Sequence, residues 1–379
     1  MKRFFALLLI LALLLAHTAS FAVMTPPYPL EPTAAVWRTY DPALRYYYQQ
    51  LTEPEKRRFS ARYDSIALGQ AELWDYPGAR LTRAGIARIN YVMAYDCPEL
   101  QYHLLDDLVE EVDRVQPPDA EACARHSARM AEMLSACMDA LDAIRLEPEW
   151  GESDFEKEVA VDRYLARNCR YEREAEGAKM DVRLRTAYSA LANGSAVCAG
   201  YAEAVTLALR CLGIPCVRVN GEYYPGDGSV SGHAWNLVRI GGEWYHEDAT
   251  WNDADSDELL EDFCPCMNRT STEVAYVLRA EQLRVQLGFT IPFCGAVRDN
   301  YYVRKGQMLD GDWQETAAAL LEEAYAQGKH AIGFRFSDLE AFLSAVDLLE
   351  SGEPTALDAI SFPFTYCWIE SVNFLHFSW

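Results

Sequence analysis

Apolar residues recur at helical spacing through the first part of the chain, from residue 23 to residue 150. A helix start is predicted at Thr82, and a longer helix begins at about Asp119, after the QPP break at residues 116–118. Three stripes with steps of three or four residues mark the buried faces: Phe59, Tyr63 and Ile66; Ile86, Ile89 and Met93; Met130, Leu134, Cys137, Leu141 and Ile144. We therefore expect a helical N-terminal region with these stripes in its core.

The pattern changes after residue 150, where helical and strand-like periods alternate. Ser153 with Glu156 forms a capping box that opens a helix ending near Arg167. A second helix begins at Cys198 and stops at the GIP sequence of residues 213–215. Alternating apolar runs then predict three strands: Cys216–Asn220, His233–Ile240 and Glu243–Asp248. Residues 151–298 are expected to form a mixed α+β core.

The tail, residues 299–379, predicts a smaller α/β region. A helix runs from Trp313 to Ala326 and ends at Gly328. Ile332, Phe334 and Phe336 alternate as a strand, the sequence SDLE at residues 337–340 caps another helix, and the aromatic C-terminus favours a strand. No internal repeat stands out.

Residues 1–22 have the pattern of a signal peptide. Lys2 and Arg3 precede an apolar run from Phe4 to Ala16, and the SFA sequence of residues 20–22 suits a signal peptidase. No later stretch has the roughly 20 apolar residues that a membrane span needs. We expect a secreted protein, extracellular or associated with the cell surface, without a membrane span.

Charge and cysteine content limit the partners and the disulfide pairings that are expected. The formal net charge of −23 becomes −25 when the leader is removed, which disfavours nucleic acid as a partner. The eleven cysteines are odd in number, so at least one thiol stays free or pairs outside the chain. Bridges between Cys211 and Cys216, or from Cys264 or Cys266 to a distant partner, are left open by the sequence.

No metal or other cofactor is expected. Cys264 and Cys266 have no matching second pair for zinc. The Asp-rich residues 252–257 lack the Gly and Glu positions of an EF-hand loop, and we expect them to form a solvated loop rather than a Ca²⁺ site.

The two strands around Gly241-Gly242 predict a hairpin that assembles an acid–base pair. If these glycines are the two loop residues, facing positions place Trp235 opposite Asp248 and His233 opposite Thr250. His233 and Asp248 then become diagonal neighbours on one face, about 7–8 Å apart along the backbone and within side-chain reach. A shift of one residue would put them on opposite faces.

The residue missing from this pair is a nucleophile, and Cys198 is the best-placed candidate. It stands at the predicted N-terminus of its helix, where the dipole and free N–H groups favour a thiolate. Small neighbours, Ala196, Ala199 and Gly200, leave room for a substrate. The backbone N–H of Cys198 could also stabilise an oxyanion. A Cys with a His that an acid orients is the pattern of nucleophilic catalysis by a thiol.

Four motifs in order carry a family resemblance: LANGSAVCAGYA at residues 191–202, GIP at 213–215, GHAWN at 232–236 and WYHEDATWND at 244–253. Together they resemble the transglutaminase-like core, the exported bacterial branch of the papain-like thiol enzyme superfamily, over about residues 153–253. The resemblance implies a papain-like core with the Cys-bearing helix packed on an antiparallel sheet. It implies the roles of nucleophile for Cys198, base for His233 and orienting acid for Asp248.

The resemblance extends to less specific positions. NCRY at residues 168–171 is similar to an upstream motif, which makes Tyr171 a candidate on the oxyanion or substrate side, together with Trp235. YDCPEL at residues 95–100 resembles a motif in the N-terminal helical regions of exported relatives. The implied substrate is a protein or peptide, with cell-wall peptides among the candidates; the oligomeric state is not indicated.

One departure from the family concerns the nucleophile's neighbours. Cross-linking transglutaminases carry Gly-Gln-Cys-Trp, whereas this chain has Ala196, Val197 and Ala199 around Cys198. The function expected is a thiol enzyme that forms a thioester acyl-enzyme from an amide, with hydrolysis (peptidase or amidase) favoured over acyl transfer. The alternatives are a catalytically idle surface-binding module that keeps the fold, and a structural protein in which Cys198 is disulfide-bonded.

Overall fold

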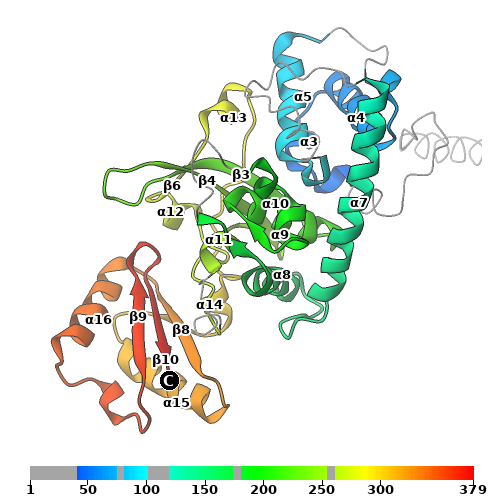
Figure 1. The fold of residues 1–379 in the computed structure, drawn as a ribbon. Helices are drawn as coiled ribbons and strands as arrows, with labels where there is room; N and C mark the ends of the chain where they lie inside the picture. The colour runs from blue at the N-terminus through cyan, green and yellow to red at the C-terminus, as the bar shows by residue number, and fades with distance from the viewer. Residues whose placement is uncertain (1–40, 75–80, 101–118, 174–180, 254–260) are drawn as a thin grey trace, which may run out of the picture. The chain divides into compact units, whose positions relative to one another are not determined.

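The computed structural model describes residues 41–74, 81–100, 119–173, 181–253 and 261–379, which all belong to one compact unit, Ala34–Trp379. The expected leader and residues 254–257 of the Asp-rich segment lie outside the described residues. The expected α+β class is confirmed (Figure 1). Among the helices described, none combines the length and the apolar character needed to cross a membrane.

The N-terminal region is helical, as its apolar stripes predict. Its α-helices are α3 (Tyr46–Gln49), α4 (Glu53–Ala67), α5 (Arg83–Tyr95) and α7 (Ala120–Ile144), with short 3₁₀ turns at Pro42–Leu44, Ala71–Leu73 and Pro98–Leu100. The predicted stripes on α4 and α7 are buried, and on α5 only Ile86 remains half-buried. Thr82 and Asp119 cap α5 and α7 by accepting hydrogen bonds from the backbone N–H groups of Gly85 and Ala122.

The central region combines a four-stranded sheet with the helices that cover it. The sheet has the order β5-β4-β3-β6 and is antiparallel throughout: β3 (Cys216–Tyr223), β4 (Ser231–Ile240), β5 (Glu243–Glu247) and β6 (Leu278–Ala280). Its helices are α8 (Asp154–Asn168), α9 (Ala187–Leu191), α10 (Cys198–Cys211), α11 (Ala249–Asn252), α12 (Ser271–Val274) and α13 (Gln282–Gln286), with a 3₁₀ turn at Val182–Arg185. A two-stranded parallel pair, β1 (Arg170–Tyr171) and β2 (Ser195–Ala196), precedes α10.

Helix α10 is the central element of this region. It packs against β3 and β4 on one side and against α8 and α9 on another, as Figure 1 shows. Every residue from Ala199 to Arg210 is therefore buried. The helix begins at Cys198, as predicted, and the sequence GIP ends it.

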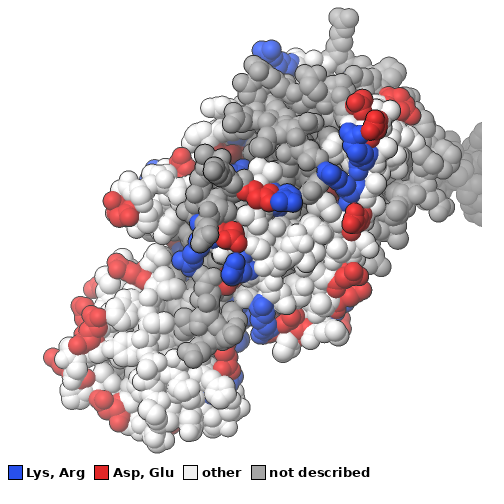
Figure 2. Space-filling view, in the orientation of Figure 1, with Lys and Arg blue, Asp and Glu red and all other residues white. Residues whose placement is uncertain are grey.

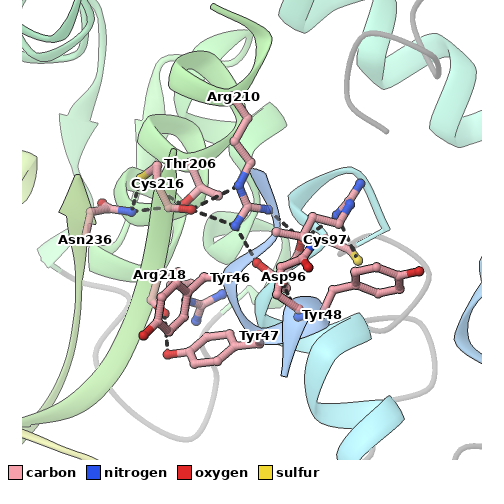
Figure 3. A network of polar contacts seen from close by, with 12 residues as sticks. Tyr46, Tyr47, Tyr48, Asp96, Cys97, Thr206, Arg210, Cys216, Arg218 and Asn236 are labelled. Atoms are coloured by element: carbon pink, nitrogen blue, oxygen red, sulfur yellow. Dashed lines mark hydrogen bonds and ion pairs between the residues drawn. The ribbon is translucent and has the colours of Figure 1, made fainter. Parts of the chain in front are cut away.

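Buried ionic contacts attach the N-terminal region to α10 (Figure 3). Arg210 of α10 donates to the backbone oxygen of Asp96 at 2.7 Å and pairs with its carboxylate. Arg45 donates to the same backbone oxygen, to Cys97 Sγ at 3.1 Å and to Glu99. The YDCPEL motif thus connects the N-terminal region to α10 by accepting hydrogen bonds from two buried arginines. Without these acceptors the buried arginines would be strongly destabilising.

The C-terminal region has a separate hydrophobic cluster around a mixed sheet of order β7-β8-β10-β9. Its elements are α14 (Tyr301–Arg304), β7 (Met308–Leu309), α15 (Trp313–Ala326), β8 (Ala331–Phe336), α16 (Leu339–Ser351), β9 (Thr365–Ile369) and β10 (Phe374–Ser378), with 3₁₀ turns at Ala356–Ala359 and Glu370–Val372. Within the SDLE sequence, Asp338 is the N-cap of α16. Strand β8 is buried on both faces, because Gly333 and Arg335 contact Asp262 and Glu273 of the central region.

The acidic excess of the sequence is unevenly distributed. From residue 306 to the end, Lys329 and Arg335 are the only basic residues among many Asp and Glu. Figure 2 shows acidic side chains without basic neighbours over this region, whereas both signs mix over the rest of the visible face. Such a surface repels polyanions.

None of the eleven cysteines, all of which fall within the described residues, is disulfide-bonded. The bridges that the sequence left open, Cys211 with Cys216 and those from Cys264 or Cys266, are not formed. Cys198 is likewise a thiol, so the disulfide alternative for it does not apply to this structure.

Candidate active site

The Cys198 thiol is presented by the first residue of α10. Val197, in extended conformation, is the N-cap, and the chain enters the helix directly from β2. Gly200 allows this close entry, since a Cβ there would lie 2.4 Å from the Leu184 backbone oxygen. Cys198 is half-buried, whereas the rest of α10 up to Arg210 is buried. The helix therefore presents this thiol at its partly accessible end.

The predicted hairpin register is confirmed. Asn236 pairs with Glu247 and Ile240 with Glu243, so Gly241 and Gly242 are the two loop residues. Both glycines have positive φ, +58° and +92°, which side chains rarely adopt and two-residue hairpins of this kind require. Regular pairing stops at Glu247, and the next residue is Asp248, the predicted diagonal neighbour of His233.

The structure brings Cys198, His233 and Asp248 into one hydrogen-bonded row. His233 Nε2 lies 2.7 Å from Asp248 Oδ2. The other ring nitrogen, Nδ1, is left for the hydrogen bond between His233 and Cys198. His233 and Asp248 are only 9% and 4% exposed, so the pair is shielded from water. A carboxylate at Nε2 directs Nδ1 toward the sulfur and favours a protonated ring.

The electrostatics favour a thiolate–imidazolium pair. Burial alone would lower the pKa of His233, but the charge and hydrogen bond of Asp248, together with Cys198, raise the pKa to about 10. Burial alone would raise the pKa of Cys198, but the hydrogen bond and charge of His233 and the backbone N–H of Ala234 hold that pKa below its usual value. A thiolate is the nucleophilic form of cysteine.

Trp251, on the single turn of α11, covers the ring of His233. The two rings stack with centroids 4.7 Å apart and an interplanar angle of 11°. Tyr223, at the end of β3, packs edge-on against Trp251 with centroids 4.7 Å apart. The sequence analysis did not identify Trp251 as a site residue. Trp251 follows Asp248 by three residues, and in a helical turn that spacing puts both side chains on the same side.

The two other predicted site residues have different surroundings. Trp235 is 2% exposed, and its indole N–H donates to His246 Nδ1 at 3.0 Å. This donor is therefore engaged away from Cys198, and the expected substrate-side position of Trp235 is not what the structure has. Tyr171 is half-buried on β1, opposite Ala196 of β2. Tyr171 and Cys198 both pack against the small apolar cluster of Val197, Ala199, Ala202 and Ala234. The predicted role of Tyr171 stays a prediction.

A buried amide fixes the Cys-bearing helix to the His-bearing strand (Figure 3). Asn236 Nδ2 donates to the Ala202 backbone oxygen and to Thr206 Oγ1, each at 2.9 Å. Asn236 lies three residues after His233, and Ala202 lies one helical turn after Cys198. The contact therefore sets the distance between sulfur and imidazole.

The described residues contain no group of three or more His, Cys, Asp or Glu side chains arranged to hold a metal ion. The expectation of a solvated loop at residues 252–257 is wrong for its first residue, because Asn252 is 0% exposed. It closes α11 and donates into a buried acidic cluster described below.

Comparisons with known proteins find one family model and partial likenesses to solved structures. Residues 146–249 match the family model of the transglutaminase-like superfamily. Two solved structures resemble parts of the chain: a protein from Cytophaga hutchinsonii described as a "putative cysteine protease" (22% identity, TM-score 0.25, 30% of this chain and 37% of that one) and a protein described as a TGase (19% identity, TM-score 0.27, 39% and 36%). The chain thus spans little more than a third of either. No curated protein matches.

Proposed function

Because residues 146–249 form a domain of the transglutaminase-like superfamily, we propose that the protein is a thiol enzyme that cleaves amide bonds through Cys198, His233 and Asp248. The observation that carries the proposal is the hydrogen-bonded row that joins Asp248 to His233 and His233 to Cys198. All three side chains come from different elements, α10, β4 and the start of α11, which only the folded chain brings together.

The chemistry follows from the charge state of the row. The Cys198 thiolate attacks the carbonyl carbon of an amide, and the electron pair of the C=O bond moves to oxygen. The imidazolium of His233 then protonates the leaving nitrogen, the C–N bond breaks, and a thioester remains on Cys198. Neutral His233 next removes a proton from water, whose oxygen attacks the thioester carbon. The C–S bond then breaks, which releases the acid and returns the electron pair to Cys198 as the thiolate beside protonated His233. Asp248 stabilises the imidazolium in each half-reaction.

The oxyanion is proposed to form at the N-terminus of α10. The first backbone N–H groups of an α-helix have no partner within the helix, and the one on Cys198 lies beside the carbon that the sulfur attacks. Tyr171 is proposed to line the substrate side of this position, since it packs against the same small apolar cluster as Cys198.

Hydrolysis is favoured over acyl transfer to an amine. Ala199, which follows Cys198, and Val197, which precedes it, are small or branched apolar residues packed in a buried cluster. They supply neither an amide donor nor an aromatic wall for an acyl-acceptor tunnel. We propose a peptide or protein substrate outside the cell, with cell-wall peptides among the candidates.

Iodoacetamide labelling with peptide mapping tests the nucleophile without knowledge of the substrate. We expect Cys198 to react first at pH 7. Cys367 is the matched comparison, since it is exposed, but burial of its sulfur raises its pKa. Equal and slow labelling of both thiols would contradict the proposal and favour a non-catalytic binding module.

A screen of peptide amides, with and without an amine acceptor, tests the reaction. We expect release of free acid from some peptide amide by the wild type and not by Cys198→Ser. Faster turnover with the amine, and the amine in the product, would replace hydrolysis by acyl transfer.

A further inference from the structure

We propose that Asn252, together with the buried carboxyl groups of Glu247 and Asp162, positions Asp248 and thereby sustains the Cys198–His233 ion pair. This inference rests on the proposed function of the Cys198 site. It assigns these three residues a positioning role, since none of them touches the sulfur or the imidazole.

The side chain of Asp248 has little else to orient it. Its Oδ2 faces His233, whereas its buried Oδ1 has no hydrogen-bond partner among the described residues. The direction of the carboxylate therefore depends on where the backbone of residues 247–252 lies. Two hydrogen bonds fold this segment into one turn. The backbone N–H groups of Trp251 and Asn252 both donate to the backbone oxygen of Asp248, at 3.1 Å each.

Asn252 anchors that turn with almost all of its polar atoms. Its Nδ2 donates to Asp162 Oδ1 at 2.9 Å and to Glu247 Oε1 at 3.2 Å. Its Oδ1 accepts from the backbone N–H of Cys266 at 2.8 Å. Its backbone oxygen accepts from Arg163 Nη2 at 3.2 Å. Helix α8 and the loop at Cys266 thus hold the far end of the turn.

Glu247 anchors the near end, and its burial favours the neutral form of the carboxyl group. It is 1% exposed, and its Oε2 has no hydrogen-bond partner among the described residues. Burial, followed by the charges of Asp162 and Glu158, raises its pKa well above the usual value. The remaining groups that face this cluster are Arg163, paired with Asp162, and the Cys264 thiol, 3.8 Å from Asp162.

The charge balance explains why an amide occupies position 252. Arg163 offsets the charge of Asp162, and a second carboxylate without a partner would be strongly unfavourable at this depth. The Asn252 amide satisfies both acids without adding charge. An aspartate there would keep the shape and the acceptor for Cys266, but would lose both donated hydrogen bonds.

The test compares Asn252→Asp with Asn268→Asp in the full chain. Asn268 is the matched control, because it is also 0% exposed and its Nδ2 donates to Glu158 Oε2 at 2.7 Å and to the Asp299 backbone oxygen at 3.0 Å rather than to Glu247 or Asp162. We expect both variants to unfold at lower temperature. In Asn252→Asp alone, the His233 titration midpoint should fall by about one pH unit, and iodoacetamide should label Cys198 about tenfold more slowly at pH 7.

An unchanged His233 midpoint in Asn252→Asp, or an equal shift in both variants, would overturn the proposal. A second pair of variants, at Glu247, keeps the test valid if Asn252→Asp fails to fold. Glu247→Gln mimics the neutral acid and should label Cys198 within about twofold of the wild type, whereas Glu247→Leu should lose about as much as Asn252→Asp. Equal rates for the two substitutions would also overturn it.

The readouts separate this inference from the proposed function. Titration and labelling need no substrate. If Cys198 reacts no faster than Cys367 in the wild type, the proposed function fails first. If Cys198 is fast in every variant, only the positioning role fails.

Discussion

Two histidines on the same face of the β4–β5 hairpin have opposite acid–base character. His233 and His246 are similarly buried, at 9% and 6% exposed. The pKa of His233 is raised to about 10, while that of His246 is lowered to about 3. Burial lowers both, so the neighbours make the difference: Asp248 beside His233, and the Arg269 guanidinium near His246.

The hydrogen bonds follow the same division. His246 Nδ1 accepts from Trp235, and Nε2 lies 3.1 Å from Ser271 Oγ, so a neutral ring satisfies both contacts. His233 lies between a carboxylate and a sulfur, so a charged ring donates to both. One hairpin therefore holds one imidazole whose surroundings favour the neutral form and another whose surroundings favour the charged form.

The largest expected effect is the loss of the sulfur. Cys198→Ser should reduce turnover of any amide substrate by about 10⁴-fold or more, because the hydroxyl does not ionise beside His233. The His233 titration midpoint should fall as well, since the thiolate helps to hold the proton. Steady-state kinetics and circular dichroism of the same sample are the measurement. Activity within tenfold of wild type would show that another group is the nucleophile.

Removing the charge of Asp248 should make His233 resemble His246. In Asp248→Asn the main cause that raises the His233 pKa is gone, so the midpoint should drop below about 6.5 and turnover should fall by about 10²–10⁴-fold. The pH–rate profile reports this change. For the wild type we expect activity to fall on the acid side, as the thiolate is protonated, and on the alkaline side near pH 10. An alkaline limit unchanged in Asp248→Asn would contradict the assignment.

Removing the ring that covers His233 should have a moderate effect. Trp251→Ala removes a cation–π contact worth about 1 kcal/mol, so turnover should fall about fivefold. Trp251→Phe keeps a ring and serves as the control. Equal kinetics of the two variants would mean that the stacking does not contribute.

The smallest effect on activity is expected at the other histidine. His246→Leu leaves the Trp235 N–H without its acceptor, which should reduce the free energy of unfolding by about 1–3 kcal/mol. Between pH 6.5 and 3 the unfolded state binds a proton at His246 that the folded state does not, so wild-type stability rises with pH there and the variant should lose that slope. Chemical denaturation at several pH values measures both. A His233 titration that shifts in His246→Leu would show that the two sites are coupled.

Local patterns predicted much of the fold. Capping boxes, apolar stripes and the Gly241-Gly242 loop marked the helix starts and the hairpin register, because each depends on residues close in sequence. Strand β6 pairs with β3 across more than 50 residues, and that short segment has no periodicity of its own. The burial of both faces of β8 likewise depends on distant partners, Asp262 and Glu273.

The candidate site also has residues that local patterns predicted and residues that only the folded chain reveals. The placement of His233 near Asp248 followed from the register, and that of Cys198 from a helix start. Trp251 and Asn252 were missed because α11 is a single turn whose direction no periodic pattern gives. Glu247 and Asp162 lie in different elements, so only the folded chain shows that they share one buried site.

We expect one buried histidine of this hairpin, His233, to be charged at neutral pH and the other, His246, to be neutral. Nuclear magnetic resonance titration of the two imidazoles, assigned with His233→Gln and His246→Leu, measures this directly. The expected midpoints are near pH 10 for His233 and near pH 3 for His246. A neutral His233 ring at pH 7, with a midpoint below 6.5, would contradict this expectation.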